Sequence, residues 1–321
     1  MLVFSVETSC DETSVCIIDN KKTILSHIIY TQEQHSEFGG VIPELAARSH
    51  LQILQKISKK ALNEANTNIN DIDLFAATCG PGLMGGLLVG STFAKALAIG
   101  SKKPFVPINH LEAHLLSPTI NNEIHYPFIS FLLTGGHTQI YLIKNINDYE
   151  LLGETLDDAI GEAFDKVAKL LGMDYPGGSK LEKIAKNGNR FAYSLPKPLY
   201  KNRNLNFSFS GIKTAVNLLV KKNIDKNNNK NFIADVAASF QETISQILES
   251  KFNLAYDELS KRKIYTKQIS LVGGVASNKY ILNKIKIIAD KLNYSVILPP
   301  KNMLSDNAAM VGWACIKKYT L

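Results

Sequence analysis

Two histidines four residues apart are the sharpest chemical feature of this sequence. In the segment His110-Leu-Glu-Ala-His114, a helix would place both imidazoles on one face, within reach of one metal ion. Two exposed histidines on a surface helix would give the same pattern, so the residues alone leave both interpretations open. A zinc peptidase needs a glutamate directly after its first histidine, whereas Glu112 comes second and points away from the shared face.

A metal site on two histidines needs a further ligand, for which Asp306 is the candidate. It lies in the segment Ser305-Asp-Asn, directly before the apolar run 308–314. Ser, Asp and Asn are also the residue types that cap helix N-termini. On the residues alone, the capping interpretation of Asp306 is the stronger one.

Carboxylates crowd two other segments. Glu7, Asp11 and Glu12 lie in and beside the turn after the first apolar run, where they could bind a cation, orient a nucleophile or act as ordinary turn residues. The segment 154–165 stacks like charges on one face of an expected helix, which costs stability unless a cation lies nearby. Such crowding favours a ligand-binding or metal-binding role for this segment.

Three glycine turns have the form of phosphate or nucleotide contacts: 134–137, 175–178 and 273–278. The first and third follow apolar strands, where exposed backbone N–H groups can face an anion. The segment 80–85 also matches G-x-G-x-x-G. However, Pro81 removes an N–H, and no acidic residue follows at the distance that a Rossmann fold requires.

The order of apolar runs predicts an α/β protein, because expected strands alternate with expected helices. Strands are expected at 2–7, 15–19, 72–79, 105–108, 128–133 and 139–143, and helices near 43–51, 91–99 and 306–318. The pattern of strand, polar turn and strand occurs at the start and again about 120 residues later. This indicates two related lobes, 1–125 and 126–305, with the helix in 306–321 packing back on the first.

Composition is that of a soluble protein, with 45% hydrophobic and 20% charged residues. Four scattered cysteines and no signal peptide favour a reducing, cytoplasmic setting. The uncharged run 74–94 is long enough to cross a bilayer, but its glycines favour a buried strand, a turn and a buried helix. The net charge of +7 favours an anionic partner. Basic residues concentrate in one region: Lys197, Lys201, Arg203, Lys213, Lys221, Lys222, Lys226 and Lys230.

Taken together, these segments resemble the TsaD family of tRNA threonylcarbamoyltransferases. The matching motifs are Glu7-Thr-Ser-Cys-Asp-Glu12, Gly39-Gly-Val-Ile-Pro-Glu-Leu-Ala46, Gly80-Pro-Gly-Leu83, His110-x-x-x-His114, Gly135-Gly-His-Thr-Gln139, Gly161-Glu-Ala-Phe-Asp-Lys166, Asp174-Tyr-Pro-Gly-Gly178, Phe207-Ser-Phe-Ser-Gly211, Gly273-Gly-Val275 and Asp306-Asn307. They occur in the family's order over almost the whole chain, and 80–83 and 207–211 look like the bacterial branch. Ser179 and Asn206 depart from residues that are frequent in the family.

The resemblance implies a two-lobed, actin-like (ASKHA, ribonuclease H-like) ATPase fold with its active site in a cleft between the lobes. It replaces the capping interpretation of Asp306, because it assigns His110, His114 and Asp306 to one metal ion, iron or alternatively zinc. It maps the substrate pocket onto residues of the glycine turns and the acidic helix: Leu132, Leu133, Thr134, Gly135, Gly136, Asp165, Gly178 and Asn278.

The activity implied is a metal-dependent acyl transfer to tRNA. The threonylcarbamoyl group passes from threonylcarbamoyl-AMP to the exocyclic amine of the adenosine 3′ to the anticodon, in tRNAs that read codons beginning with A. Asp11 or Glu12 would accept the proton of the attacking amine or position the adenine base of the tRNA. A TsaB-like paralogue and a TsaE-like ATPase are the expected partners, without a membrane. A small-molecule kinase of the same fold and a metal-dependent peptidase are the alternatives; the histidine pair disfavours the first and the position of Glu112 the second.

Overall fold

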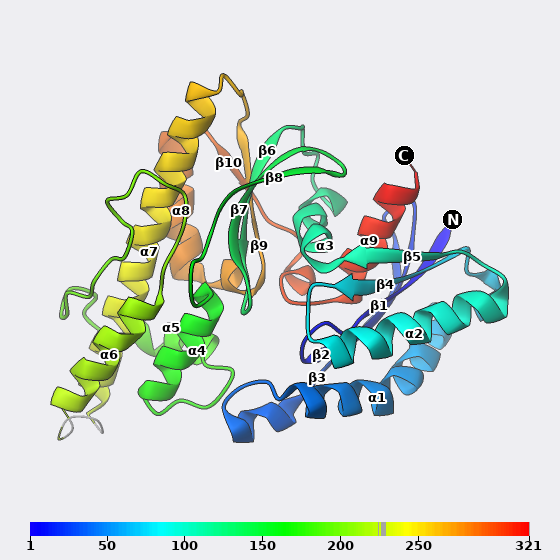
Figure 1. Cartoon of the computed structure of the whole chain (residues 1–321), viewed down its shortest axis with the longest axis horizontal. Helices are drawn as coiled ribbons and strands as arrows, with labels where there is room; N and C mark the ends of the chain where they lie inside the picture. Colours follow the sequence, from blue (N-terminus) through cyan, green and yellow to red (C-terminus); the bar gives the residue numbers. More distant parts are fainter. Residues whose placement is uncertain (224, 226–228, 321) are drawn as a thin grey trace. The chain divides into compact units, whose positions relative to one another are not determined.

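The computed structural model describes residues 1–223, 225 and 229–320, and it divides into two compact units (Figure 1). The first unit combines Met1–Glu123 with Pro299–Leu321, and the second is Ile124–Leu298. Each unit contains one five-stranded sheet with helices against it. The α/β class expected from the alternating apolar runs is confirmed.

The sheet of the first unit has the order β3-β2-β1-β4-β5. Its strands are β1 (Leu2–Glu7), β2 (Glu12–Asp19), β3 (Ile24–Thr31), β4 (Leu74–Gly80) and β5 (Phe105–Asn109). The first three strands are antiparallel neighbours, and β4 and β5 run parallel to β1. The expected hairpin of the first two strands is therefore present. The edge strand β3 was not predicted, because several of its apolar side chains are exposed and its pattern does not alternate cleanly.

Helices cover both faces of this sheet. They are α1 (Pro43–Glu64), α2 (Met84–Ser101), α3 (His110–Leu116) and α9 (Ala308–Tyr319), with short 3-10 turns η1 (Glu33–Phe38), η2 (Ile69–Asp71), η3 (Ser117–Ile120) and η6 (Lys301–Met303). Alternate residues of a strand face opposite sides of the sheet. Val3 accordingly joins a core with α3 and α9, whereas its neighbour Phe4 joins a core with α1 and α2. The final helix is fastened further, because Ser5 Oγ donates to the carbonyl of Ala308 at 2.7 Å.

The uncharged run 74–94 forms a buried strand, a turn and the start of α2. By length and composition alone, α2 is long and apolar enough to cross a membrane. Within the structure, 28% of this helix is buried. It packs against β4 and α1, and it exposes Met84, Leu88 and Ile99. The strand is thus as expected, but the helix is half-covered rather than buried.

Glycines of this run allow α2 to touch the turn that follows β1. A Cβ on Gly86 would lie 2.2 Å from the carbonyl oxygen of Thr8, and one on Gly90 would lie 2.1 Å from Thr8 Oγ1. Gly82 approaches the backbone of Ser9 in the same way, and Leu83 N donates to Ser9 O at 2.8 Å. Within the segment that matches G-x-G-x-x-G, Gly82 therefore allows close backbone packing in this unit.

The second unit repeats the topology of the first. Its strands are β6 (Phe128–Leu133), β7 (Thr138–Asn145), β8 (Asp148–Glu154), β9 (Gln268–Val272) and β10 (Ser295–Ile297). The order β8-β7-β6-β9-β10, with two antiparallel and two parallel pairings, corresponds to β3-β2-β1-β4-β5. Its helices are α4 (Ile160–Leu170), α5 (Gly178–Ala185), α6 (Ser210–Lys222), α7 (Lys230–Lys261) and α8 (Lys279–Lys291), with the 3-10 turn η5 (Gly274–Ser277).

Candidate metal centre and substrate residues

The short helix α3 positions both histidines of the sequence motif. Asn109 caps it, because its side-chain oxygen accepts from Leu111 N at 2.9 Å and Glu112 N at 3.1 Å. The helical spacing then brings the two imidazoles together edge to face, with ring centroids 4.8 Å apart and an interplanar angle of 87°. His110 is 5% exposed and His114 is fully buried, so the pair is not a surface feature.

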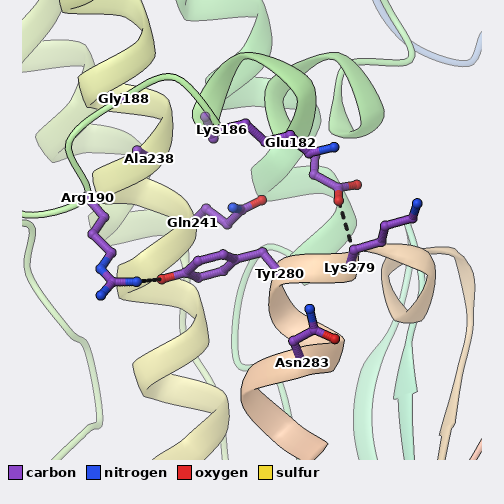
Figure 2. A pocket seen from close by; sticks show the side chains of 10 residues that line it. Glu182, Lys186, Gly188, Arg190, Ala238, Gln241, Lys279, Tyr280 and Asn283 are labelled. Atoms are coloured by element: carbon purple, nitrogen blue, oxygen red, sulfur yellow. Dashed lines mark hydrogen bonds between the residues drawn. The ribbon is translucent and has the colours of Figure 1, made fainter.

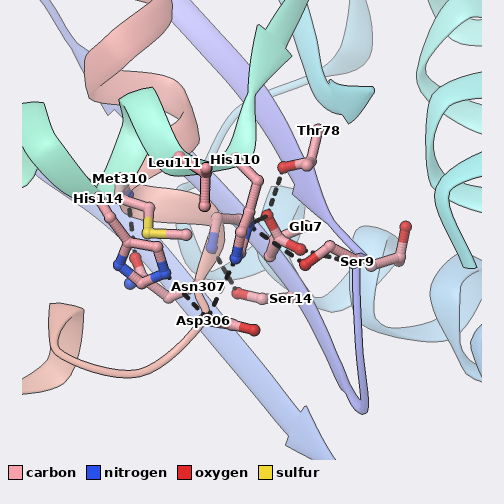
Figure 3. A network of polar contacts seen from close by, with 12 residues as sticks. Glu7, Ser9, Ser14, Thr78, His110, Leu111, His114, Asp306, Asn307 and Met310 are labelled. Carbon is pink, nitrogen blue, oxygen red and sulfur yellow. Dashed lines mark hydrogen bonds and ion pairs between the residues drawn. The ribbon is translucent and has the colours of Figure 1, made fainter. Parts of the chain in front are cut away.

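Asp306 meets both imidazoles within the first unit (Figure 3). Its Oδ1 lies 3.0 Å from His114 Nε2 and 3.5 Å from His110 Nε2. The helix cap is supplied by the next residue, since Asn307 Oδ1 accepts from Met310 N at 2.9 Å. The capping interpretation of the segment 305–307 therefore applies to Asn307 and leaves Asp306 free to face the histidines.

The charges of this cluster suit a cation. Burial alone would raise the pKa of Asp306, but His110 and His114 lower it well below its usual value. Burial lowers the pKa of His114, whereas Asp306 and Glu7 overcome the same effect at His110 and raise its pKa. One ligand atom from each of His110, His114 and Asp306 lies within 4.8 Å of the other two. Two imidazole nitrogens and a carboxylate oxygen are donors that divalent iron and zinc accept.

Glu112 takes no part in this cluster. Its Oε2 accepts from Lys318 Nζ on α9 at 2.6 Å, and its side chain is 11% exposed. Glu112 therefore points away from the two imidazoles, in agreement with the order of residues in the motif. It is not placed to act as the base of an H-E-x-x-H peptidase.

Asp11 and Glu12 lie where the loop after β1 enters β2. Asp11 is 9% exposed, and Glu12 is half-buried as the first residue of β2. Burial, followed by the negative charges of Asp11 and Asp306, raises the pKa of Glu12 well above its usual value. A carboxylate with a raised pKa is a better proton acceptor than an ordinary one.

The first and third glycine turns lie together in the second unit. The turn after β6 is closed by Thr134, whose N–H donates to His137 O at 2.9 Å. A Cβ on Gly273 would lie 2.5 Å from Leu133 O, and one on Gly161 would lie 2.8 Å from Gly135 Cα. Gly135 and Gly136 are exposed, so the segment 132–136 offers accessible backbone at the end of a buried strand.

Asp165 and Asn278 hold neighbouring backbone in place. Asp165 Oδ1 accepts from Gly177 N at 2.8 Å and Gly178 N at 3.2 Å, which ties α4 to the second glycine turn. Asn278 caps α8 by accepting from Ile281 N at 3.1 Å, and its Nδ2 donates to Gln241 Oε1 at 2.9 Å. Both expected substrate residues thus have clear structural contacts.

A pocket of about 360 Å³ opens beside these residues in the second unit (Figure 2). Glu182, one turn after Gly178 on α5, accepts from Lys279 N at 3.0 Å. The pocket is lined by Glu182, Ala185, Lys186, Gly188, Arg190, Ala238, Gln241, Lys279, Tyr280 and Asn283. Sequence reasoning missed these residues; a signal existed only for those near a glycine-turn motif, such as Glu182 after the turn 175–178 and Lys279 after the turn 273–278.

Lysine side chains form ion pairs with the acidic segment 154–165, as expected from its stacked negative charges. Asp158 accepts from Lys166 Nζ at 2.8 Å and from Lys213 Nζ at 3.0 Å. Asp157 holds the N-terminus of α6, because it accepts from Phe209 N at 2.7 Å and Ser210 N at 3.2 Å. These two carboxylates therefore join the segment before α4 to α6, and the ligand-binding or metal-binding role expected of this segment stays a prediction.

Over nearly its full length, the chain is similar to proteins that share one name. The family model described as "TsaD: tRNA N6-adenosine threonylcarbamoyltransferase" matches residues 23–313. A relative from Rickettsia rickettsii (strain Sheila Smith), named tRNA N6-adenosine threonylcarbamoyltransferase, is 46% identical over 99% of this chain and 92% of the relative.

Solved structures agree with the fold at low sequence identity. HypF from T. kodakarensis superposes with a TM-score of 0.64 at 14% identity, over 99% of this chain and 48% of HypF. Component A of (R)-2-hydroxyglutaryl-CoA dehydratase from Acidaminococcus fermentans superposes with a TM-score of 0.52 at 15% identity, over 100% of this chain and 99% of component A. The fold is thus the actin-like ASKHA fold, and the family match over most of the chain shows that this protein belongs to the TsaD family of tRNA N6-adenosine threonylcarbamoyltransferases.

Proposed function

We propose that this protein transfers a threonylcarbamoyl group from threonylcarbamoyl-AMP to the exocyclic amine of the adenosine 3′ to the anticodon. The substrates are tRNAs that read codons beginning with A. Family membership supports the reaction, and the buried cluster of His110, His114 and Asp306 is the observation that supports a metal-dependent site. In the reaction, the amine nitrogen bonds to the carbamoyl carbon, the bond from that carbon to the phosphate oxygen breaks, and AMP leaves.

The metal would be held by His110 Nε2, His114 Nε2 and a carboxylate oxygen of Asp306. Iron(II) is the expected ion, with zinc as the alternative, because two imidazoles and a carboxylate suit both. When bound, a divalent ion supplies Lewis-acid stabilisation of negative charge on donor oxygens. His110 and Asp306 are nearly buried, so the surrounding protein excludes much of the water that would screen this charge.

The proton of the attacking amine needs an acceptor, for which Asp11 and Glu12 are the candidates. The raised pKa of Glu12 supports its role as the base, with Asp11 beside it in the turn. The donor's adenylate is assigned to the segment 132–136 together with Asp165, Gly178 and Asn278. Accessible backbone at Gly135 and Gly136 supports this assignment, since N–H groups of such turns bind phosphate.

The basic region is proposed to contact the tRNA backbone. Six of its members are exposed: Lys197, Lys201, Arg203, Lys221, Lys222 and Lys230. Lys213 is instead paired with Asp158, and Lys226 lies outside the described residues. Reversing the charge of Lys221 and Lys222 should weaken tRNA binding and flatten its salt dependence. The matched control is the exposed pair Lys56 and Lys59 on α1; equal losses in both double variants would argue against a specific contact.

A TsaB-like paralogue and a TsaE-like ATPase are the proposed protein partners, and the cytoplasm is the proposed location. The exposed apolar side chains of α2, Met84, Leu88 and Ile99, support a protein partner, because interaction surfaces expose apolar residues. Leu51 on the neighbouring α1 is 70% exposed and extends the apolar character of these two helices.

The test is transfer in vitro with purified protein, both partners, threonylcarbamoyl-AMP and unmodified tRNA. Digested nucleosides are analysed by mass spectrometry. The wild type should form threonylcarbamoyladenosine, His110→Ala should not, and Glu112→Gln should retain activity because Glu112 faces Lys318. No product from the wild type, beside an active enzyme of the family as positive control, would overturn the proposed function.

A further inference from the structure

Glu7 is a completely buried carboxylate at the end of β1, beside His110 of the candidate metal centre. Its exposed fraction is 0%, and it faces Nδ1 of His110, whereas Asp306 faces Nε2 of the same ring (Figure 3). A buried carboxylate is costly unless its oxygens are hydrogen-bonded or paired with positive charge. Its contacts therefore indicate why it is present.

Each oxygen of Glu7 has a donor. Oε1 accepts from Ser9 N at 2.6 Å, and Oε2 accepts from the hydroxyl of Thr78. Oε2 also lies 3.2 Å from Nδ1 of His110. The first two contacts hold the carboxylate in one orientation, and the third is its only contact with a side chain of the candidate metal centre among the described residues.

This contact selects one tautomer of His110. An ionised carboxylate has no proton to donate, so Nδ1 must carry the proton that joins it to Glu7. In the neutral imidazole that a metal ion requires, the lone pair is then on Nε2, the nitrogen that faces Asp306. Ser9 Oγ also lies 3.2 Å from Nδ1, but a hydroxyl both donates and accepts and therefore does not select the tautomer by itself.

His114 provides an internal comparison. Its Nδ1 is buried and has no hydrogen-bond partner in the described part of the chain, although its Nε2 faces Asp306 in the same way. Of the two imidazoles, only His110 has a carboxylate behind it among the residues described. A carboxylate that accepts from the outer nitrogen of a ligating histidine orients the ring and strengthens its donor nitrogen.

We propose that Glu7 is a positioning residue for the metal centre, holding His110 in the Nδ1-protonated tautomer with Nε2 directed at the ion. The inference rests on the proposed metal site at His110, His114 and Asp306. It assigns to the motif Glu7-Thr-Ser a task that is separate from proton transfer by Asp11 or Glu12. Ser9 and Thr78 serve this task indirectly, because each donates to Glu7.

The experiment measures metal affinity, with cobalt(II) as the probe. The metal-free protein is titrated in competition with a chelator of known affinity, and the visible absorption of the bound ion is followed. Glu7→Ala should weaken cobalt binding by about 10- to 100-fold, as the loss of an outer carboxylate does elsewhere. Glu7→Gln, which keeps a side-chain oxygen for the Nδ1–H group, should lose less. Glu112→Gln, which removes a largely buried carboxylate from the same helix α3, should bind as the wild type does.

Two further measurements separate positioning from a general structural role. Melting of each metal-free variant reports folding alone, and Glu7→Gln stands in if Glu7→Ala does not fold. In the zinc-loaded protein, ¹H–¹⁵N correlations of the imidazoles should show His110 protonated at Nδ1 in the wild type. Protonation at Nε2 instead would overturn the proposal.

Cobalt binding by the His110 and Glu7 variants distinguishes a wrong role for Glu7 from a wrong metal site. If His110→Ala binds cobalt as well as the wild type does, the proposed metal site itself is wrong. If His110→Ala loses binding while Glu7→Ala and Glu7→Gln keep wild-type affinity, the metal site stands and the role of Glu7 is refuted.

Discussion

Oδ1 of Asp306 lies 3.0 Å from Nε2 of His114, although 192 positions separate the two residues in the chain. The contact exists because α9 packs against the sheet and α3, which brings the turn before α9 to the histidines. A carboxylate in this position is expected to complete a metal site. Its removal should lower metal content more than removal of a residue, such as Glu7, that contacts only a metal ligand.

Asp306→Ala should therefore lose bound metal. We expect a fall in affinity beyond the roughly 10- to 100-fold that outer residues cause, because a direct ligand is removed. Metal content after dialysis, measured by elemental analysis, checks this expectation. The exposed Asp290 on α8 provides the control variant Asp290→Ala. Wild-type metal content in Asp306→Ala would remove Asp306 from the proposed ligand set.

Replacing Glu12 by Gln should lower kcat for threonylcarbamoyl transfer by about 100-fold or more, with metal content unchanged. The reason is that a carboxamide cannot accept the amine proton. Since the pKa of Glu12 is raised, the fraction of ionised Glu12 grows with pH, and kcat of the wild type should rise with pH through that pKa. If Asp11→Asn abolishes transfer and Glu12→Gln does not, Asp11 is the base instead.

Two glycines of α2 should respond in opposite directions to alanine. In Gly86→Ala the new Cβ would meet the backbone carbonyl of Thr8, so we expect a loss of about 1–3 kcal/mol in the free energy of unfolding. Gly100 has no atom within 4 Å of the corresponding position, and there alanine should stabilise the helix by up to about 1 kcal/mol. Urea denaturation of both variants measures the difference. Equal effects would show that the contact with Thr8 relaxes without cost.

His27 should make stability depend on pH. Burial lowers its pKa from 6.5 to about 4, and its Nε2 has no hydrogen-bond partner among the described residues. Between these values the unfolded chain binds more protons, so this contribution is complete above pH 6.5 and is lost as pH falls towards 4. We expect this contribution to the free energy of unfolding to be about 3 kcal/mol.

The His27 contribution is measured from urea denaturation across this pH range. The variant His27→Asn should show a flatter stability profile than the wild type. His125 is exposed, and His125→Asn should leave the profile unchanged. Identical slopes in the wild type and His27→Asn would refute the assignment.

Much of the fold was predictable from local patterns. Apolar runs at 2–7 and 128–133 coincide with β1 and β6, and Pro43 begins α1 as expected of proline at a first helical position. These elements were recognisable because period and helix-start signals act within a few residues. The edge strand β3 was not recognisable, because its residues are only partly covered and its burial follows no simple period.

The sequence by itself determined that His110 and His114 would share one face of a helix at that segment, because spacing along a helix depends only on backbone geometry. It also contained the family motifs and the repeated hairpin that gave the fold class. Which residue of the segment 305–307 caps α9 was decided only in three dimensions, since Asp and Asn cap helices almost equally well. Packing of α9 on the first sheet turned Asn307 towards the helix and Asp306 towards the histidines. The contact of Glu7 with His110 likewise depends on the folded structure, because no local pattern relates the end of β1 to a helix 103 residues later.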